Sequence, residues 1–190
     1  MKIVKVVISI VLLLSVLVTT VYAGDYTFGF LSENGFQQQE QSLWCWVASA
    51  RNSVRFERTI LRSQKSAVKK IKDEVVNDSG TLTEIVRAAE YISYGTEDYV
   101  AIRKEMSFAD LKNQVKRGNV TIACCGYYDS NGNRTGGHVV VITGYLENAQ
   151  NNYIYYFDPL DGVSYTCSYT EFCNGSFNGM EYKETAYNNE

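Results

Sequence analysis

The spacing of apolar side chains changes once along this chain, at Gly118, and this change strongly constrains the fold. Before Gly118, apolar residues recur about every 3.6 positions, which places them on one face of a helix. After Gly118 they alternate with polar residues or form short β-branched runs, as is typical of strands. Helices followed by strands predict an α+β fold. A length of 190 residues favours a single domain.

Helices are expected before Gly118, each indicated by an apolar face and by residues that favour helix ends. The clearest begins at Thr81, because Thr81 and Glu84 have the spacing of a capping box. Gly118 is a typical stop for the last helix. The expected ranges are Cys45 to Ile60 or Leu61 with Ser42 as a candidate cap, Ser66 to Val76, Thr81 to Ile92, and Ser107 to Arg117.

Strands are expected after Gly118, and adjacent ones should pair as antiparallel hairpins. A loop rich in turn residues spans Tyr128 to Asn133, and Asp161-Gly162 is a hairpin turn signal. The expected strands are Val120 to Cys124, His138 to Tyr145, Tyr153 to Phe157, and Val163 to Cys167.

Residues 1–23 have the layout of a secretory signal peptide. Lys2 and Lys5 precede an apolar run, and Val21-Tyr22-Ala23 is a small-residue cleavage site. The alternative is an uncleaved anchor, but the run is short for a spanning helix, which needs about 20 apolar residues. We therefore expect residues 24–190 to form the mature domain, free of the membrane after cleavage and secreted to the extracellular space or the periplasm.

The charge pattern argues against nucleic acid as a partner. The formal net charge is −3, and the sequence contains no basic stripe. Lysines do gather in one stretch, but the pattern predicts the solvated face of a helix, with Val68, Ile71 and Val75 on the opposite face. These lysines are Lys65, Lys69, Lys70 and Lys72.

Five cysteines leave at least one thiol unpaired in a monomer, which is the form we expect. Cys45 is the candidate free thiol. Any disulfide should involve Cys167 or Cys173, which are close in sequence, since export places the protein where disulfides persist. Cys124 and Cys125 are adjacent and would point to opposite faces of a strand. Buried thiols are the alternative for these four cysteines.

Cys45 and His138 are the leading candidates for chemistry. His138 is the only histidine, and it lies between Gly136-Gly137 and the apolar run Val139 to Ile142. A thiol at a helix start lies near the positive end of the helix dipole, which favours the thiolate, and a nearby imidazole can pair with it. The alternatives are a structural histidine and a cysteine buried in an aromatic core.

Two polar residues could support that pair. Asp158 ends the strand after that of His138, where it could accept a hydrogen bond from the imidazole. Gln39 lies six residues before Cys45 and could donate to a developing oxyanion with the Cys45 N–H. The alternatives are that Asp158-Pro159 forms an ordinary turn after the strand, and that Gln39 belongs to a polar, glutamine-rich loop without a catalytic role.

These motifs resemble those of papain-like cysteine peptidases. Gln39, followed six residues later by Cys45 in Ser-Leu-Trp-Cys-Trp-Val-Ala, is similar to the active-site helix of these peptidases. The sequences around His138 and Asp158 are similar to their histidine and aspartate motifs. The bacterial members most alike are the avirulence-effector proteases and the peptidase domains related to those that process bacteriocin leaders. The resemblance implies a papain-like fold, with the nucleophile at the start of a helix and an antiparallel C-terminal sheet that carries the histidine and the aspartate.

The same resemblance implies the chemistry. Cys45 would be the nucleophile, His138 the general base and acid, Asp158 the orienting residue, and Gln39 part of the oxyanion hole. The reaction would be hydrolysis of a protein or peptide substrate through a thioester, with no organic cofactor and no metal. Two alternatives stay open: an amidase, transglutaminase or acyltransferase on the same triad, and a non-catalytic secreted binding domain.

Overall fold

The computed structural model describes residues 27–54 and 61–190. The predicted signal peptide and its cleavage site lie outside these residues, and so does Ile60. Within the two described ranges, no helix has the length and the apolar character needed to cross a membrane.

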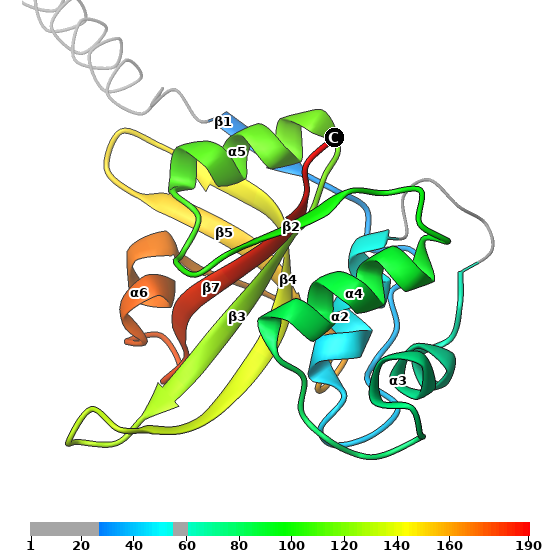
Figure 1. The fold of residues 1–190 in the computed structure, drawn as a ribbon. Coiled ribbons are helices and arrows are strands. Elements are labelled where there is room, and N and C mark those ends of the chain that lie inside the picture. Colours follow the sequence, from blue (N-terminus) through cyan, green and yellow to red (C-terminus); the bar gives the residue numbers. More distant parts are fainter. Residues whose placement is uncertain (1–26, 55–60) are drawn as a thin grey trace, which may run out of the picture.

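An antiparallel sheet forms the centre of the molecule (Figure 1). Its strand order is β2-β7-β3-β4-β5-β6, with β1 paired to β4 outside this path, and every pairing is antiparallel. The strands are β1 (Thr27–Phe30), β2 (Tyr99–Ile102), β3 (Thr121–Tyr128), β4 (Arg134–Glu147), β5 (Asn152–Asp158), β6 (Val163–Ser168) and β7 (Glu181–Asn188).

The helices gather in two groups on either side of the sheet (Figure 1). One group consists of α2 (Cys45–Ser53), α3 (Gln64–Lys72) and α4 (Leu82–Ile92), and the other of α5 (Phe108–Arg117) and α6 (Tyr169–Asn174). Local chemistry sets several of their ends. Thr81 and Glu84 form the predicted capping box at α4, and Gly118 ends α5 in a left-handed conformation with φ of 90°.

Two hydrophobic cores result, because successive residues of a strand point to opposite faces. Cys124 and Val139 pack with α2, α3 and α4, whereas Cys125 and Val140 pack with α5 and α6. The sheet thus lies between the two cores, and the first core fixes α2 against β3 and β4.

Several expected boundaries shift in the structure. The helix predicted from Cys45 ends at Ser53, and Leu61 lies outside any helix. The helix predicted to reach Val76 ends at Lys72, because Asp73 adopts a left-handed φ of 66°. Val75 is consequently exposed, while Val68 and Ile71 are buried as predicted. Of the lysines on this helix, Lys72 is not free in solvent but pairs with Glu84 at 2.8 Å.

The five cysteines all carry free thiols. This agrees with the prediction for Cys45. Of the two possibilities left open for the other four cysteines, the structure has free thiols, which are buried at Cys124, Cys125 and Cys167 and half-buried at Cys173. Cys167 is buried in the second core, and Cys173 packs against the same core, where its side chain hydrogen-bonds with Tyr169. The two thiols thus share one core without a bond between them.

Candidate active site

Cys45 is the first residue of α2, and two tryptophans anchor it there. Trp44 Nε1 donates to the Val76 oxygen at 2.8 Å, and Trp46 Nε1 donates to the Asp78 oxygen at 3.0 Å. Both indoles are buried, whereas Cys45 is half-buried. The helix start is thus fixed to the segment before α4, while Cys45 between the two tryptophans in sequence stays partly exposed.

The start of α2 has no side-chain cap. Trp44 occupies the N-cap position, and Ser42, the candidate cap, instead accepts a hydrogen bond from Asn77 at 2.9 Å. Because no side chain satisfies the N–H groups of the first turn, their partial positive charge remains next to Cys45. This environment favours a negative charge on a substrate oxygen bound beside the helix start.

His138 and Asp158 form a buried hydrogen-bonded pair. Nε2 of His138 lies 2.6 Å from Oδ1 of Asp158, and each residue is only 8 % exposed. The same carboxylate oxygen accepts the backbone N–H of Leu160 at 2.8 Å, which fixes its orientation. Burial alone would lower the pKa of His138, but hydrogen bonds with Asp158 and Cys45 and their negative charges raise it to about 9.

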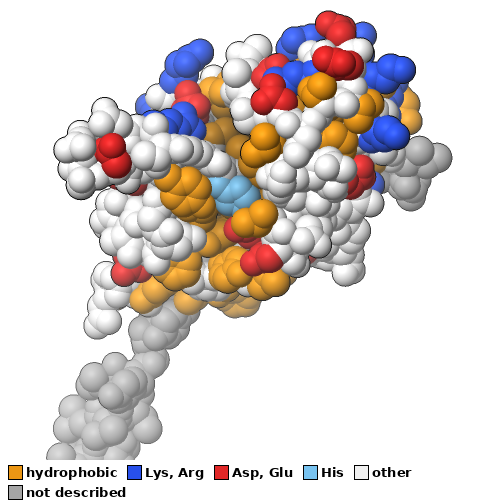
Figure 2. Space-filling model, turned by 90° about the horizontal axis from the view of Figure 1, so that it is seen from below, with side chains coloured by type: hydrophobic (Ala, Val, Ile, Leu, Met, Phe, Trp, Pro, Cys, Tyr) orange, Lys and Arg blue, Asp and Glu red, His pale blue; other side chains and the backbone are white. Residues whose placement is uncertain are grey.

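The thiol and the imidazole share one cleft. Cys45 and His138 both line a cavity of about 800 Å³ between the α2–α4 side and the β3–β4 side. Figure 2 shows the histidine at the surface, between hydrophobic side chains. Because Asp158 occupies Nε2, Nδ1 is the ring nitrogen left for the thiol. The arrangement can therefore hold a proton between sulfur and imidazole, with a carboxylate behind the ring.

Two further side chains of α2, which the sequence analysis missed, fix this helix to β4 and to the segment before the helix. Ser49, one turn after Cys45 in α2, donates from Oγ to the Val139 oxygen at 2.9 Å. Asn52 exchanges two hydrogen bonds of 2.9 Å with the backbone of Gln37. Both side chains are fully buried. Their spacing from Cys45 on a predicted helix was a usable signal, since small polar residues on the buried face of a helix require partners.

Gln39 lies at the edge of this arrangement. Its backbone N–H donates to the Pro159 oxygen at 2.8 Å, next to Asp158. Its side-chain Nε2 donates to the backbone oxygens of Gln41 and Ser42, both at 2.9 Å, and Gln39 is not among the residues that line the cleft. Its oxyanion role therefore stays a prediction, and it requires the amide to turn toward the cleft.

Comparisons with known proteins agree with this architecture. The model of the Peptidase_C39 like family matches residues 33–185. No curated protein matched the sequence. A digestive procathepsin L 3 of the Tenebrio molitor larval midgut is similar in structure, with a TM-score of 0.56, 14% identity, and coverage of 84% of this chain and 67% of that chain.

A second similar chain comes from a structural study of antibody cross-reactivity between the mite allergens Blo t 1 and Der p 1. It has a TM-score of 0.52 and 12% identity, and the match covers 83% of this chain and 67% of that chain. At such low identities, these two matches support the fold alone, which is papain-like as predicted. Since the family match covers most of its length, this chain belongs to the Peptidase_C39 like family.

Proposed function

We propose that this chain is a secreted cysteine peptidase that hydrolyses peptide bonds through a thioester on Cys45. Family membership supports a cysteine peptidase in general. The observation that carries the residue roles is the 2.6 Å contact between His138 Nε2 and Asp158 Oδ1, on a ring that faces the same cleft as Cys45. The substrate is accordingly a protein or a peptide.

In the proposed reaction, the Cys45 thiolate attacks the carbonyl carbon of the scissile bond. The negative charge moves to the carbonyl oxygen, where the Cys45 N–H and a reoriented Gln39 amide would stabilise it. Imidazolium His138 then gives its proton to the leaving amine as the C–N bond breaks. Water attacks the thioester and gives a proton to His138, so the acid is released and the thiolate returns.

The charge state of His138 supports this sequence of steps. With a pKa of about 9, the imidazole is protonated at neutral pH while it lies beside Cys45 and Asp158. An imidazolium is the form that pairs with a thiolate and that can protonate a leaving amine. Asp158 stabilises this form and holds the ring by Nε2, so that Nδ1 carries the transferred proton.

The test is covalent labelling of the purified mature protein with an epoxide-type thiol inhibitor. We expect one modification, at Cys45, together with loss of peptide hydrolysis. Cys124 lines the same cleft and is the internal control, because burial raises the pKa of its thiol far above the usual value and leaves it unreactive. Labelling of Cys124 in place of Cys45 would contradict the proposal.

Two substitutions complete the test. Cys45→Ala should abolish hydrolysis and labelling without loss of the fold, because alanine is well tolerated at a helix start. His138→Ala should be nearly as inactive, since no other imidazole exists in the sequence. A His138→Ala protein with full activity on a peptide would overturn the mechanism.

Sequencing the N-terminus of the exported protein tests secretion, with Gly24 as the expected first residue.

A further inference from the structure

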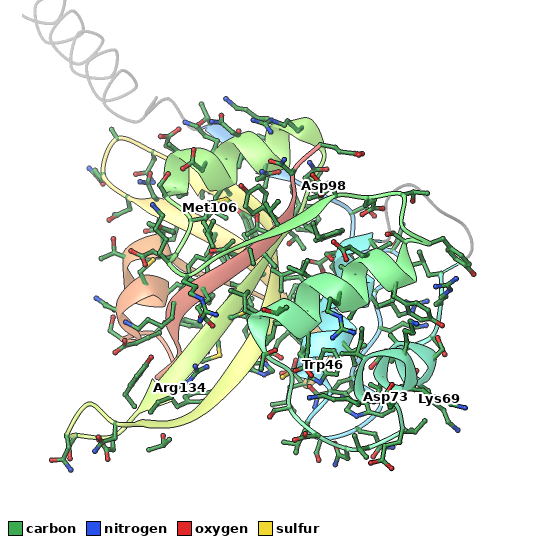
Figure 3. The ribbon with its side chains drawn as sticks, in the orientation of Figure 1. Trp46, Lys69, Asp73, Asp98, Met106 and Arg134 are labelled. Carbon is green, nitrogen blue, oxygen red and sulfur yellow. The ribbon has the colours of Figure 1, made fainter. Side chains whose placement is uncertain are left out.

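The cleft has a charged wall that the proposed catalytic steps do not use. Arg103, Arg134 and Glu184 all line the cavity that contains Cys45 and His138. Figure 3 shows Arg134 on the β3–β4 hairpin and Trp46 on the facing, helical side. Two guanidinium groups and one carboxylate give this wall an excess of one positive charge.

Within this wall, Arg103 and Glu184 form an ion pair, so Arg134 carries the positive charge that no carboxylate of the wall neutralises. Glu184 Oε1 lies 3.7 Å from Arg103 Nη1. Among the described residues, Arg134 has no carboxylate within ion-pair distance. A cation in a cleft without an internal partner is available to an anionic group of a bound molecule.

Arg134 is also held in place before any substrate binds. Its Nε donates to the Gly136 oxygen at 3.0 Å, and its Nη2 donates to the Cys125 oxygen at 3.3 Å. A Cβ atom at Gly137 would lie only 2.7 Å from Nη2 and 3.0 Å from the Cys125 oxygen. The Arg134 guanidinium therefore packs against the backbone at Gly137, where a side chain would leave no room for it. Gly137 is the residue directly before His138.

These bonds leave part of the guanidinium free. An arginine has five N–H donors in a rigid plane, and the two backbone oxygens engage two of them. A carboxylate can accept two parallel hydrogen bonds from such a fork. Because Arg134 is already ordered, little side-chain entropy is lost when it binds a ligand.

We infer that the cleft selects substrates with an acidic side chain, Asp or Glu, which Arg134 binds close to the scissile bond. This inference rests on the proposed peptidase function and names its substrate class. The net charge of the chain is −3, so the protein as a whole does not attract acidic peptides. The preference must therefore come from the local contact with Arg134.

The experiment compares peptides that differ only by Glu versus Gln, or Asp versus Asn, at each position around the scissile bond. We expect kcat/KM to favour the acidic member by about tenfold at one position, the scale of one charge-assisted hydrogen bond. The preference should shrink as salt is raised, because a partly exposed ion pair is screened.

Variants assign the preference to Arg134. Arg134→Gln should bring the Glu/Gln ratio close to one, and Arg134→Lys should retain part of it, because lysine keeps the charge but lacks the fork. Lys183→Gln is the matched control. It removes an equal charge on β7, where Lys183 pairs with Glu181 outside the cleft lining, and it should leave the ratio unchanged.

The outcomes separate the two proposals. If the wild type cleaves peptides but shows no acidic preference at any position, or if the preference survives in Arg134→Gln, the inference is wrong and the peptidase proposal stands. If Arg134→Gln does not fold, the Arg134→Lys ratio and the salt dependence of the wild type decide instead. Absence of all cleavage together with no labelling of Cys45 overturns the peptidase proposal and the inference with it.

Discussion

Ser49 and Val139 are joined by a buried hydrogen bond of 2.9 Å from the serine Oγ to the backbone oxygen. The bond connects α2, one turn beyond Cys45, to β4, one residue beyond His138. It is thus a direct link between the two elements that carry the proposed nucleophile and base. The bond therefore fixes the helix that carries the sulfur to the strand that carries the imidazole.

Replacing Ser49 by alanine should loosen that link. The buried Val139 oxygen would lose its side-chain partner, which costs about 1–3 kcal/mol of stability. We also expect slower alkylation of Cys45 and a changed pH dependence of that rate, because the imidazole is no longer held at the thiol. Both are measured with a thiol-reactive probe across a pH series.

Ser53→Ala is the matched control for Ser49→Ala. Ser53 is also a buried serine of α2, but its Oγ bonds to Ala50 within the helix and to Tyr99 rather than to β4. It should lower stability and leave the pH dependence of alkylation unchanged. Equal pH profiles in both variants would assign Ser49 a purely structural role.

Asp158→Asn should shift the alkaline limit of activity toward lower pH. The pKa of His138 is about 9 against an ordinary value of 6.5, and the Asp158 carboxylate is one cause of this increase. Without the negative charge, the imidazolium loses its proton at lower pH. The profile of kcat/KM against pH measures the shift, and an unchanged alkaline limb would show that Asp158 does not set this pKa.

The same pKa makes stability depend on pH. A group whose folded pKa is raised stabilises the native state through its protonated form. For His138, this contribution is fully present below pH 6.5 and is lost as the pH rises through about 9. Urea unfolding should therefore show a decrease in stability across this window that is smaller in Asp158→Asn. An equal decrease in both proteins would attribute it to other groups.

Gln39→Ala should lower kcat by about a hundredfold or more, the scale of one lost oxyanion donor. Gln38→Ala is the control, because Gln38 Nε2 also contacts the same loop, at the Leu160 oxygen, 2.7 Å away. It should leave kcat nearly unchanged. Small and similar losses of kcat in both variants would mean that the Gln39 side chain does not act on the oxyanion. The role of Gln39 would then be to hold its segment against the loop after Asp158, through its backbone hydrogen bond to Pro159.

Gly80→Ala should destabilise the wall of the cleft. A Cβ atom at Gly80 would lie 2.4 Å from Trp46 Cδ2 and 2.5 Å from Trp46 Cγ. The buried indole cannot move freely, so we expect a loss of about 1–3 kcal/mol, as for other overpacked sites. Thermal unfolding measures it. Gly136→Ala is the control, since its Cβ would meet Tyr127 at an ordinary 3.5 Å, and an equal loss there would contradict the explanation.

Local signals were enough to predict several elements of the fold. The capping box at Thr81 and the glycine stop at Gly118 act within one turn of the chain, and both appear as expected. The Asp161-Gly162 turn is equally local, with Gly162 at a φ of 75°. In each case, neighbouring residues contain the physical cause of the structure.

The strand β7 could not be predicted from such local signals. It was not predicted, although it lies inside the sheet between β2 and β3. Its sequence, Glu-Tyr-Lys-Glu-Thr-Ala-Tyr-Asn, is mostly polar, and Tyr182 and Ala186 become buried only when the strand joins the sheet and its two faces are covered by the two cores. The short elements β1, β2 and α6 were missed for a similar reason, because each is too short to show a period.

The sequence by itself determined which groups are available for chemistry: one imidazole, a cysteine at the start of a helix, and an aspartate at the end of a strand. Tertiary structure alone decided which atoms meet. The pairing of β4 with β5 brings Asp158 to Nε2 of His138, and the packing of α2 against β4 brings Cys45 into the same cleft. These outcomes depend on strand register and side-chain direction between residues far apart in the chain, which no local pattern specifies.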